Sequence, residues 1–138
     1  MIKSLWINLP VKDVAASKDF FSKLGFKDNN NYGNREDSAS FLVGDNGLVL
    51  MLFEKSLYEN FAGTRLSGEK SGAGVLFSFD AESPEEVDEL AKKVLEAGGK
   101  LYAEPGYNDG WMYGCGFMDL DGQHWNILYM DMSKIPLG

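Results

Sequence analysis

The stretch MYGCGFMDLDGQHWN, residues 112–126, carries the strongest structural signal in the chain because it joins two strand-like segments through a turn. Aromatic and branched side chains, which favour strands, lie on both sides of Asp121-Gly122, a pair typical of tight turns. A second stretch, SFLVGDNGLVLM at residues 40–51, has the same design, with its turn at 44–47. The sequence therefore predicts two antiparallel hairpins that are built alike.

A helix is predicted upstream of each hairpin. Asp13 is suited to cap a helix that begins at Val14, and Gly25 is suited to end it. The segment SPEE at residues 83–86 combines an N-cap serine, a proline at the first helical position and a capping-box glutamate. That second helix is expected to end at the two glycines 98–99. Strands are predicted over residues 4–10, 40–43, 48–53, 75–79, 112–118 and 124–130. An extended segment is also predicted from residue 26 onward, and a further strand is expected to start over residues 100–103.

The repeated order of these elements predicts an α+β fold. Two βαβββ half-repeats would form two curved mixed sheets that enclose one cleft, with the helices on the outer faces. Residues 1–138 would make a single domain, with half-repeat 1 over 1–55, a linker over 56–73, half-repeat 2 over 74–131 and a loose tail over 132–138. The linker is expected to contain one helical turn near Tyr58. The cleft is the default binding site.

Composition and charge exclude several classes of partner. The 138 residues carry a net charge of −8, which would repel a phosphate backbone and attract a cationic small molecule over long range. Alternatively, the negative net charge serves solubility alone and indicates no particular ligand. One cysteine, Cys115, gives no disulfide within the chain, which fits a reducing compartment. With no long apolar segment, the sequence predicts a cytoplasmic protein with no membrane or nucleic-acid partner.

Segments in both halves resemble the vicinal oxygen chelate superfamily, which includes glyoxalase I, extradiol dioxygenases, thiol-transferring fosfomycin-resistance enzymes and bleomycin-binding proteins. The resemblance lies in residues 9–14 leading to 20–26, and in 112–122 followed by Trp125 and 129–131. The C-terminal segment is similar to a bacterial branch described as predicted lactoylglutathione lyase. The resemblance covers most of the chain, and it implies the cleft fold and a homodimer in which both protomers contribute walls to the cleft.

The resemblance also implies a divalent metal held by His and Glu side chains on the inner face of the cleft. The corresponding positions are Trp6, Met51, Gly74 and Asn126. None of them offers an imidazole or a carboxylate, and the branch usually has His where Gln123 stands and Glu where Asn126 stands. His124 is the only histidine, so one chain cannot supply two-His-one-carboxylate ligation. A dimer-shared site using both copies of His124 is the remaining alternative. The sequence therefore predicts no metal and no cofactor.

Candidate ligand-contacting residues follow from strand parity. His124 and Asn126 would share one face of the last strand, and Trp6 and Asn8 one face of the first. The predicted ligand-binding cleft is lined by Trp6, Asn8, Met51, Trp111, Tyr113, His124 and Asn126. Tyr102 and Tyr107 add to an aromatic stretch that could form a mobile wall. His124 is the candidate general base, and otherwise a hydrogen-bonded strand residue. Trp6 could instead fill the space of a lost metal, and the other aromatics could be core or dimer-interface residues.

Three functions remain open at this level. The first is a metal-free protein of the bleomycin-binding type that sequesters a cationic or aromatic small molecule in its cleft. The second is a glyoxalase-like lyase or isomerase, or a dioxygenase-related enzyme, with a non-standard site that uses His124, Glu54 or Glu36. The third is an interaction module whose site is vestigial and filled by Trp6 and Met51.

Overall fold

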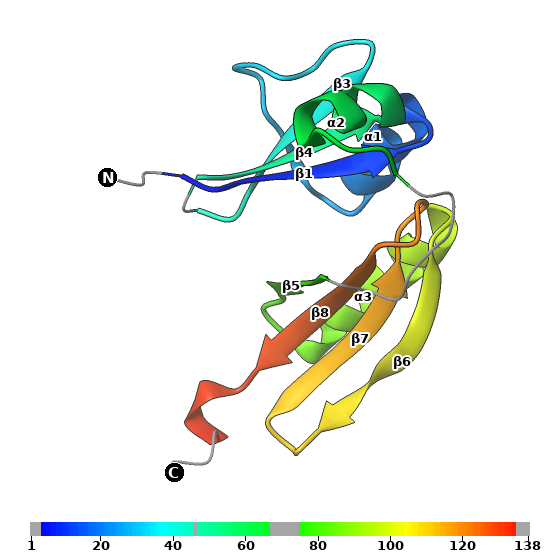
Figure 1. Cartoon of the computed structure of the whole chain (residues 1–138). Coiled ribbons are helices and arrows are strands. Elements are labelled where there is room, and N and C mark those ends of the chain that lie inside the picture. Colours follow the sequence, from blue (N-terminus) through cyan, green and yellow to red (C-terminus); the bar gives the residue numbers. More distant parts are fainter. Residues whose placement is uncertain (1–3, 46, 67–74, 135–138) are drawn as a thin grey trace. The chain divides into compact units, whose positions relative to one another are not determined.

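Two four-stranded mixed sheets, each accompanied by helices, make up the chain (Figure 1). A computed structural model describes residues 4–45, 47–66 and 75–134. The chain divides into a first unit, residues 1–70, and a second unit, residues 71–138. Each unit contains one strand–helix–three-strand series. The predicted α+β fold of two βαβββ half-repeats is therefore confirmed.

The sheet of the first unit has the strand order β1-β4-β3-β2. Strand β1 pairs in parallel with β4, whereas β3 is antiparallel to both β4 and β2. The elements of this unit are β1 (Trp6–Val11), α1 (Val14–Lys23), β2 (Lys27–Asp28), β3 (Ser38–Val43), β4 (Leu48–Glu54) and α2 (Lys55–Ala62). Because β1 and β4 are neighbours with the same direction, their C-terminal ends lie side by side and each is followed by a helix.

Helix α1 covers one face of the first sheet. It begins as predicted, since the Asp13 carboxylate accepts a hydrogen bond of 3.0 Å from the backbone N–H of Ala16. Its Phe20 and Phe21 are almost fully buried, and Phe21 packs against Phe41 of β3 with ring centroids 6.1 Å apart. Burial of such large side chains, worth about 2 kcal/mol each, makes this the main core of the unit.

Helix α2 covers the opposite face of the same sheet, where the sequence predicted a linker with one helical turn. Its Leu57 and Tyr58 pack against a buried cluster on β4 that consists of Val49, Met51 and Phe53. Phe61 stacks on Phe53 with ring centroids 5.3 Å apart. The apolar residues at positions 57, 58 and 61 form a short helical stripe. Because the neighbouring residues in the sequence are mostly polar, the segment was predicted to be a linker.

The sheet of the second unit has the strand order β5-β8-β7-β6, with β5 parallel to β8. Its elements are β5 (Leu76–Asp80), α3 (Pro84–Glu96), β6 (Lys100–Asn108), β7 (Met112–Met118), β8 (His124–Met130) and a 3-10 turn at Met132–Lys134. Strands β7 and β8 have the predicted bounds. Strand β6 starts over residues 100–103 as predicted and continues to Asn108. The second of two irregularities in its pairing with β7, between Ala103 and Gly106, accommodates Pro105 at this sheet edge. The predicted loose tail begins with the 3-10 turn, and residues 135–138 lie outside the described range.

Helix α3 covers one face of the second sheet (Figure 1). The Ser83 hydroxyl caps it by accepting a hydrogen bond of 3.1 Å from the N–H of Glu86. The Glu86 carboxylate accepts from the N–H of Glu82, one residue before the position that a capping box would use. The buried residues under the helix are Val87, Ala91 and Val94 from α3, and Phe117, Trp125 and Ile127 from the sheet. No helix among residues 75–134 packs on the other face of this sheet.

None of the helices in the described part of the chain is both long and apolar enough to cross a membrane.

Candidate functional site

The face of the second sheet opposite α3 carries a cluster of three polar and aromatic side chains, Tyr102, His124 and Asn126. His124 and Asn126 are two residues apart on β8, so their side chains lie on the same face, as predicted. The neighbours of β8 on this face include Leu76 and Ser78 of β5, which pair in register with His124 and Asn126. The face is therefore mixed, with imidazole, amide and phenol groups beside exposed aliphatic surface.

Tyr102 reaches this cluster by lying across β7. Its hydroxyl donates a hydrogen bond of 2.6 Å to Oδ1 of Asn126 and lies 3.2 Å from the carbonyl oxygen of Trp125. The ring passes over Gly116, where an added Cβ would lie 2.4 Å from ring atoms. Tyr102 follows Leu101, which pairs with Phe117 on the α3 side, so strand alternation places the Tyr102 side chain on the opposite face. Strand parity and a glycine together thus allow an edge-strand side chain to contact β8.

The Tyr102 ring also contacts the imidazole of His124, with ring centroids 4.7 Å apart and planes inclined by 31°. Partial burial, followed by the nearby charge of Cys115, raises the pKa of Tyr102 above its ordinary value. The phenol therefore stays protonated at neutral pH and acts as a hydrogen-bond donor. With 42% of its surface exposed, Tyr102 still offers ring area to a ligand.

Sequence reasoning placed Tyr102 in an aromatic stretch but not in the site itself. The signal that could have located it is the pair of glycines, Gly114 and Gly116, inside a strand. Glycine within a strand often marks the close approach of another group. The side chain that lies over Gly116 depends on the register between β6 and β7, which local sequence does not specify.

Two other predicted site residues lie elsewhere. Tyr113 has the parity of the buried Cys115, and its hydroxyl donates a hydrogen bond of 2.7 Å to Asp88 of α3, so it lies on the helix side of the sheet. This hydrogen bond, together with burial and the charge of Asp88, raises the pKa of Tyr113 to about 12. Trp111 follows the turn at Asp109-Gly110, and its carbonyl accepts from the N–H of Asp131. Neither residue belongs to the Tyr102–His124–Asn126 cluster.

In the first unit, Trp6 and Asn8 lie on the face opposite α1, as their parity predicts. Both are exposed, whereas Leu9 and Val11 of the same strand are buried. The Trp6 indole stacks on Tyr32 with ring centroids 5.1 Å apart and an interplanar angle of 18°. Tyr32 lies in the loop between β2 and β3, and it is not among the candidate site residues predicted from the sequence.

Met51 shares this face of the sheet but is covered. Only 5% of its surface is exposed, because it belongs to the cluster packed against α2 and its terminal methyl group also lies close to Gly33. Met51 is therefore a core residue of the first unit. Its place at the cleft remains a prediction.

The donor chemistry at the positions implied by the resemblance does not fit a divalent metal. Trp6 presents an indole that is engaged with Tyr32, and Met51 a buried thioether. The amide oxygen of Asn126 already accepts the Tyr102 hydroxyl. Hard and borderline divalent cations need imidazole, carboxylate or free oxygen donors, which these three residues lack. Gly74 lies outside the described residues. Among the described residues, no three His, Cys, Asp or Glu side chains are grouped closely enough to hold a metal.

The two glutamates considered as alternative catalytic residues lie together in the first unit, whereas His124 belongs to the second. A hollow at the C-terminal ends of β1 and β4 is lined by Lys12, Asp13, Val14, Ala15, Glu36, Glu54 and Lys55. Glu54 accepts a hydrogen bond of 2.8 Å from the Ser56 hydroxyl. Glu36 and Glu54 therefore lie beside two lysines.

Comparison with known proteins gives a consistent family match. A family model described as the Glyoxalase/Bleomycin resistance protein/Dioxygenase superfamily matches residues 3–127. The solved structure of a hypothetical protein from S. aureus is 37% identical to the chain, with a TM-score of 0.80, over 94% of this chain and 95% of that one. None of the curated proteins matches the sequence.

More distant solved structures share the fold. A glyoxalase/bleomycin resistance protein/dioxygenase family enzyme from Burkholderia phytofirmans PsJN is 20% identical, with a TM-score of 0.76, over 91% of this chain and 96% of that one. A lactoylglutathione lyase from Agrobacterium tumefaciens is 16% identical, with a TM-score of 0.65, over 95% of this chain and 96% of that one. At such identities the likeness concerns the fold, which hosts several chemistries.

Proposed function

This chain belongs to the glyoxalase/bleomycin resistance protein/dioxygenase superfamily, and we propose that within it the protein binds a small organic molecule without a metal. The observation that carries the proposal is the hydrogen bond of 2.6 Å from the Tyr102 hydroxyl to Oδ1 of Asn126. It engages the one oxygen donor at the four positions where the resemblance implies metal ligands.

The same cluster supplies what a small-molecule site needs. Ligand sites combine apolar surface with a few convergent polar groups, and aromatic rings bind planar molecules by stacking. Here the Tyr102 ring, the His124 imidazole and the exposed side chain of Leu76 flank the Asn126 amide. A planar ligand would stack on this surface and exchange hydrogen bonds with His124 and Asn126.

Elemental analysis tests the metal-free part of the proposal. The untagged protein would be incubated with Zn, Ni, Mn or Fe(II) and then dialysed. We expect far less than one equivalent of any metal to remain, because the donor set is unsuitable. Near-stoichiometric metal that survives dialysis would refute the proposal and favour enzyme chemistry.

A ligand screen by ligand-observed NMR tests the binding part. Planar aromatic compounds of each charge type would be screened against the wild type, Tyr102→Ala and Tyr107→Ala. Tyr107 is a matched control because it is a more exposed tyrosine on the same strand. We expect hits that lose binding in Tyr102→Ala and keep it in Tyr107→Ala. A set of hits indifferent to Tyr102 would place binding elsewhere. Turnover of a hemithioacetal that is lost in His124→Ala would support a lyase instead.

We also expect a homodimer, as the resemblance implies. Light scattering at micromolar concentration checks this expectation, and a monomer would argue against a site shared between protomers.

A further inference from the structure

Trp6 and Tyr32 form a stacked aromatic pair that remains accessible. Trp6 is 48% exposed and Tyr32 is 46% exposed, although their rings lie only 5.1 Å apart. The buried pair Phe21–Phe41 in the same unit has at most 1% exposure per residue. The Trp6–Tyr32 pair therefore leaves about half of each side chain outside any core.

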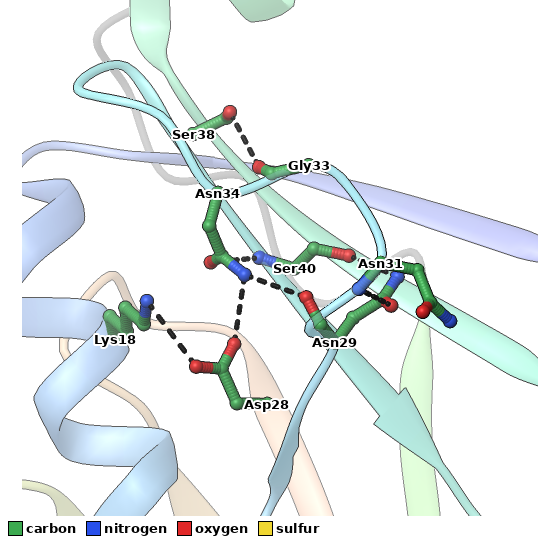
Figure 2. A network of polar contacts seen from close by, with 8 residues as sticks. All are labelled: Lys18, Asp28, Asn29, Asn31, Gly33, Asn34, Ser38 and Ser40. Carbon is green, nitrogen blue, oxygen red and sulfur yellow. Dashed lines mark hydrogen bonds and ion pairs between the residues drawn. The ribbon is translucent and has the colours of Figure 1, made fainter.

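The loop that carries Tyr32 is ordered by a network of polar contacts (Figure 2). Asn29, which is almost fully buried, donates from Nδ2 to Oγ of Ser40 at 3.0 Å and accepts at Oδ1 from the N–H of Asn31. Asn34 donates from Nδ2 to Oδ1 of Asp28 at 2.8 Å and to the carbonyl of Asn29 at 2.9 Å. These contacts fix the backbone on both sides of Tyr32.

The other end of the loop is fixed as firmly. The N–H of Ser40 donates to Oδ1 of Asn34 at 3.0 Å, and the Ser38 hydroxyl donates to the carbonyl of Gly33 at 2.7 Å. Gly33, directly after Tyr32, has φ of +97° and would bring an added Cβ to 2.6 Å from Ser40 Cβ. Only glycine suits this position, so the turn that presents Tyr32 is specified by the sequence.

Trp6 is held as well. Its Nε1 donates to Oγ of Ser4 at 3.3 Å, which satisfies the only polar group of the indole. One ring face packs against Tyr32, so the remaining exposed surface of the indole is largely aromatic. A ring pair that is both ordered and exposed is preorganised for stacking, because little side-chain freedom remains to be lost on binding.

We propose that the Trp6–Tyr32 pair is a stacking site for a planar organic cation. Indole is the aromatic side chain that attracts cations most strongly through its ring face, and the net charge of −8 favours a cation over an anion at long range. This inference goes beyond the proposed function, because it places a second binding surface in the first unit, on residues other than Tyr102, His124 and Asn126.

The test compares two probes of the same shape, N-methylacridinium, which is permanently cationic, and acridine, which is neutral at pH 8. Binding would be measured by fluorescence titration against the wild type, Trp6→Ala and Tyr32→Ala. We expect the cation to bind the wild type, to bind more tightly than acridine, and to bind each alanine variant about tenfold more weakly. Tyr107→Ala, which removes a more exposed tyrosine from the second unit, should leave binding unchanged.

Two further variants keep the test decisive if an alanine variant misfolds. Trp6→Phe and Tyr32→Phe retain a stacked pair, and only Trp6→Phe should weaken binding of the cation, because phenylalanine attracts cations less than tryptophan. Equal affinity of the cation for the wild type and all the folded variants would overturn the proposed stacking site. Failure of both probes to bind would overturn it too, while the proposed function would still be judged by the Tyr102-dependent screen.

Discussion

The Tyr102 hydroxyl lies 2.6 Å from Oδ1 of Asn126 although the two residues are on β6 and β8, which are separated by β7. A side chain spans a whole intervening strand only if that strand offers no side chain beneath it. Gly116 meets this condition, since an added Cβ would lie 2.4 Å from the Tyr102 ring. The contact between Tyr102 and Asn126 therefore depends on three strands and on one glycine.

Gly116→Ala should expel the Tyr102 ring from the sheet. We expect a loss of about 1–3 kcal/mol in the free energy of unfolding, as is typical of overpacking at a well-packed position. We also expect loss of the ring contact with His124. Urea denaturation measures the first effect, and the NMR chemical shifts of the His124 ring protons report the second. The matched control is Gly106→Ala on β6, where an added Cβ would have room, since the carbonyl oxygen of Glu104 would lie 4.0 Å away. An unchanged His124 spectrum in Gly116→Ala would contradict the proposed geometry.

Asn34→Ala should loosen the loop that presents Tyr32. The substitution removes hydrogen bonds to Asp28 Oδ1, to the carbonyl of Asn29 and from the N–H of Ser40. Each of the three hydrogen bonds is worth about 1 kcal/mol, and water will satisfy some of the groups that lose their partner. We therefore expect a loss of about 2 kcal/mol in the free energy of unfolding. Chemical denaturation provides the measurement.

Asn31→Ala is the control for this prediction, because Asn31 contributes its backbone N–H to the network and alanine keeps that group. Its stability should stay within about 0.5 kcal/mol of the wild type. Equal effects of the two substitutions would show that the Asn34 side chain does not order the loop.

Local sequence alone places several elements of the fold. Caps and turns are local, so Asp13, Ser83 and the turn at Asp121-Gly122 suffice to place helix starts and the last hairpin. The parity of His124 and Asn126 is also local, and their shared face follows from strand geometry alone.

The features that sequence missed depend on tertiary contacts. Helix α2 is stabilised by packing on β4, and its own eight residues would be too short to hold a helix in isolation. The contact of Tyr102 with Asn126 depends on the register between β6 and β7, and the contact of Tyr113 with Asp88 depends on the packing of α3 against the sheet. Tyr32 was missed because its ordering comes from a network of asparagines whose local pattern indicates only a turn.

Asp119 should make stability depend on pH in an unusual direction. Its buried carboxylate accepts hydrogen bonds from Trp125 Nε1 at 3.0 Å and from the N–H groups of Asp121 and Gln123. Burial raises the pKa of Asp119 above its ordinary value, although these hydrogen bonds lower it in part. Because the pKa of this group is higher in the folded state than in the unfolded state, the group stabilises the folded state most at pH values below its unfolded-state pKa. This stabilisation is lost as the pH rises through the folded-state pKa.

Asp119→Asn isolates that contribution. The amide keeps the size of the side chain but places an N–H donor where a carboxylate oxygen accepted, so we expect a loss of about 1–3 kcal/mol at neutral pH. The stability difference between wild type and variant should grow as pH falls below the raised pKa, where the wild-type carboxyl takes up its proton. Urea denaturation at several acidic and neutral pH values measures this difference. A difference that shrinks toward acidic pH would mean that the hydrogen bonds outweigh burial.

Cys115 should be unreactive in the folded protein. It is buried in β7, and burial, followed by the charges of Asp88 and Glu104, raises the pKa of its thiol to about 11. At pH 8 only about one thiol in a thousand would then be ionised, and the thiolate is the nucleophilic form. Alkylation by iodoacetamide should therefore be far slower in buffer than in urea, where the thiol has its ordinary pKa and full access. Mass spectrometry follows the modification, with Cys115→Ser as the unlabelled control. Native labelling as fast as that of the unfolded chain would show that the thiol is exposed and available for chemistry.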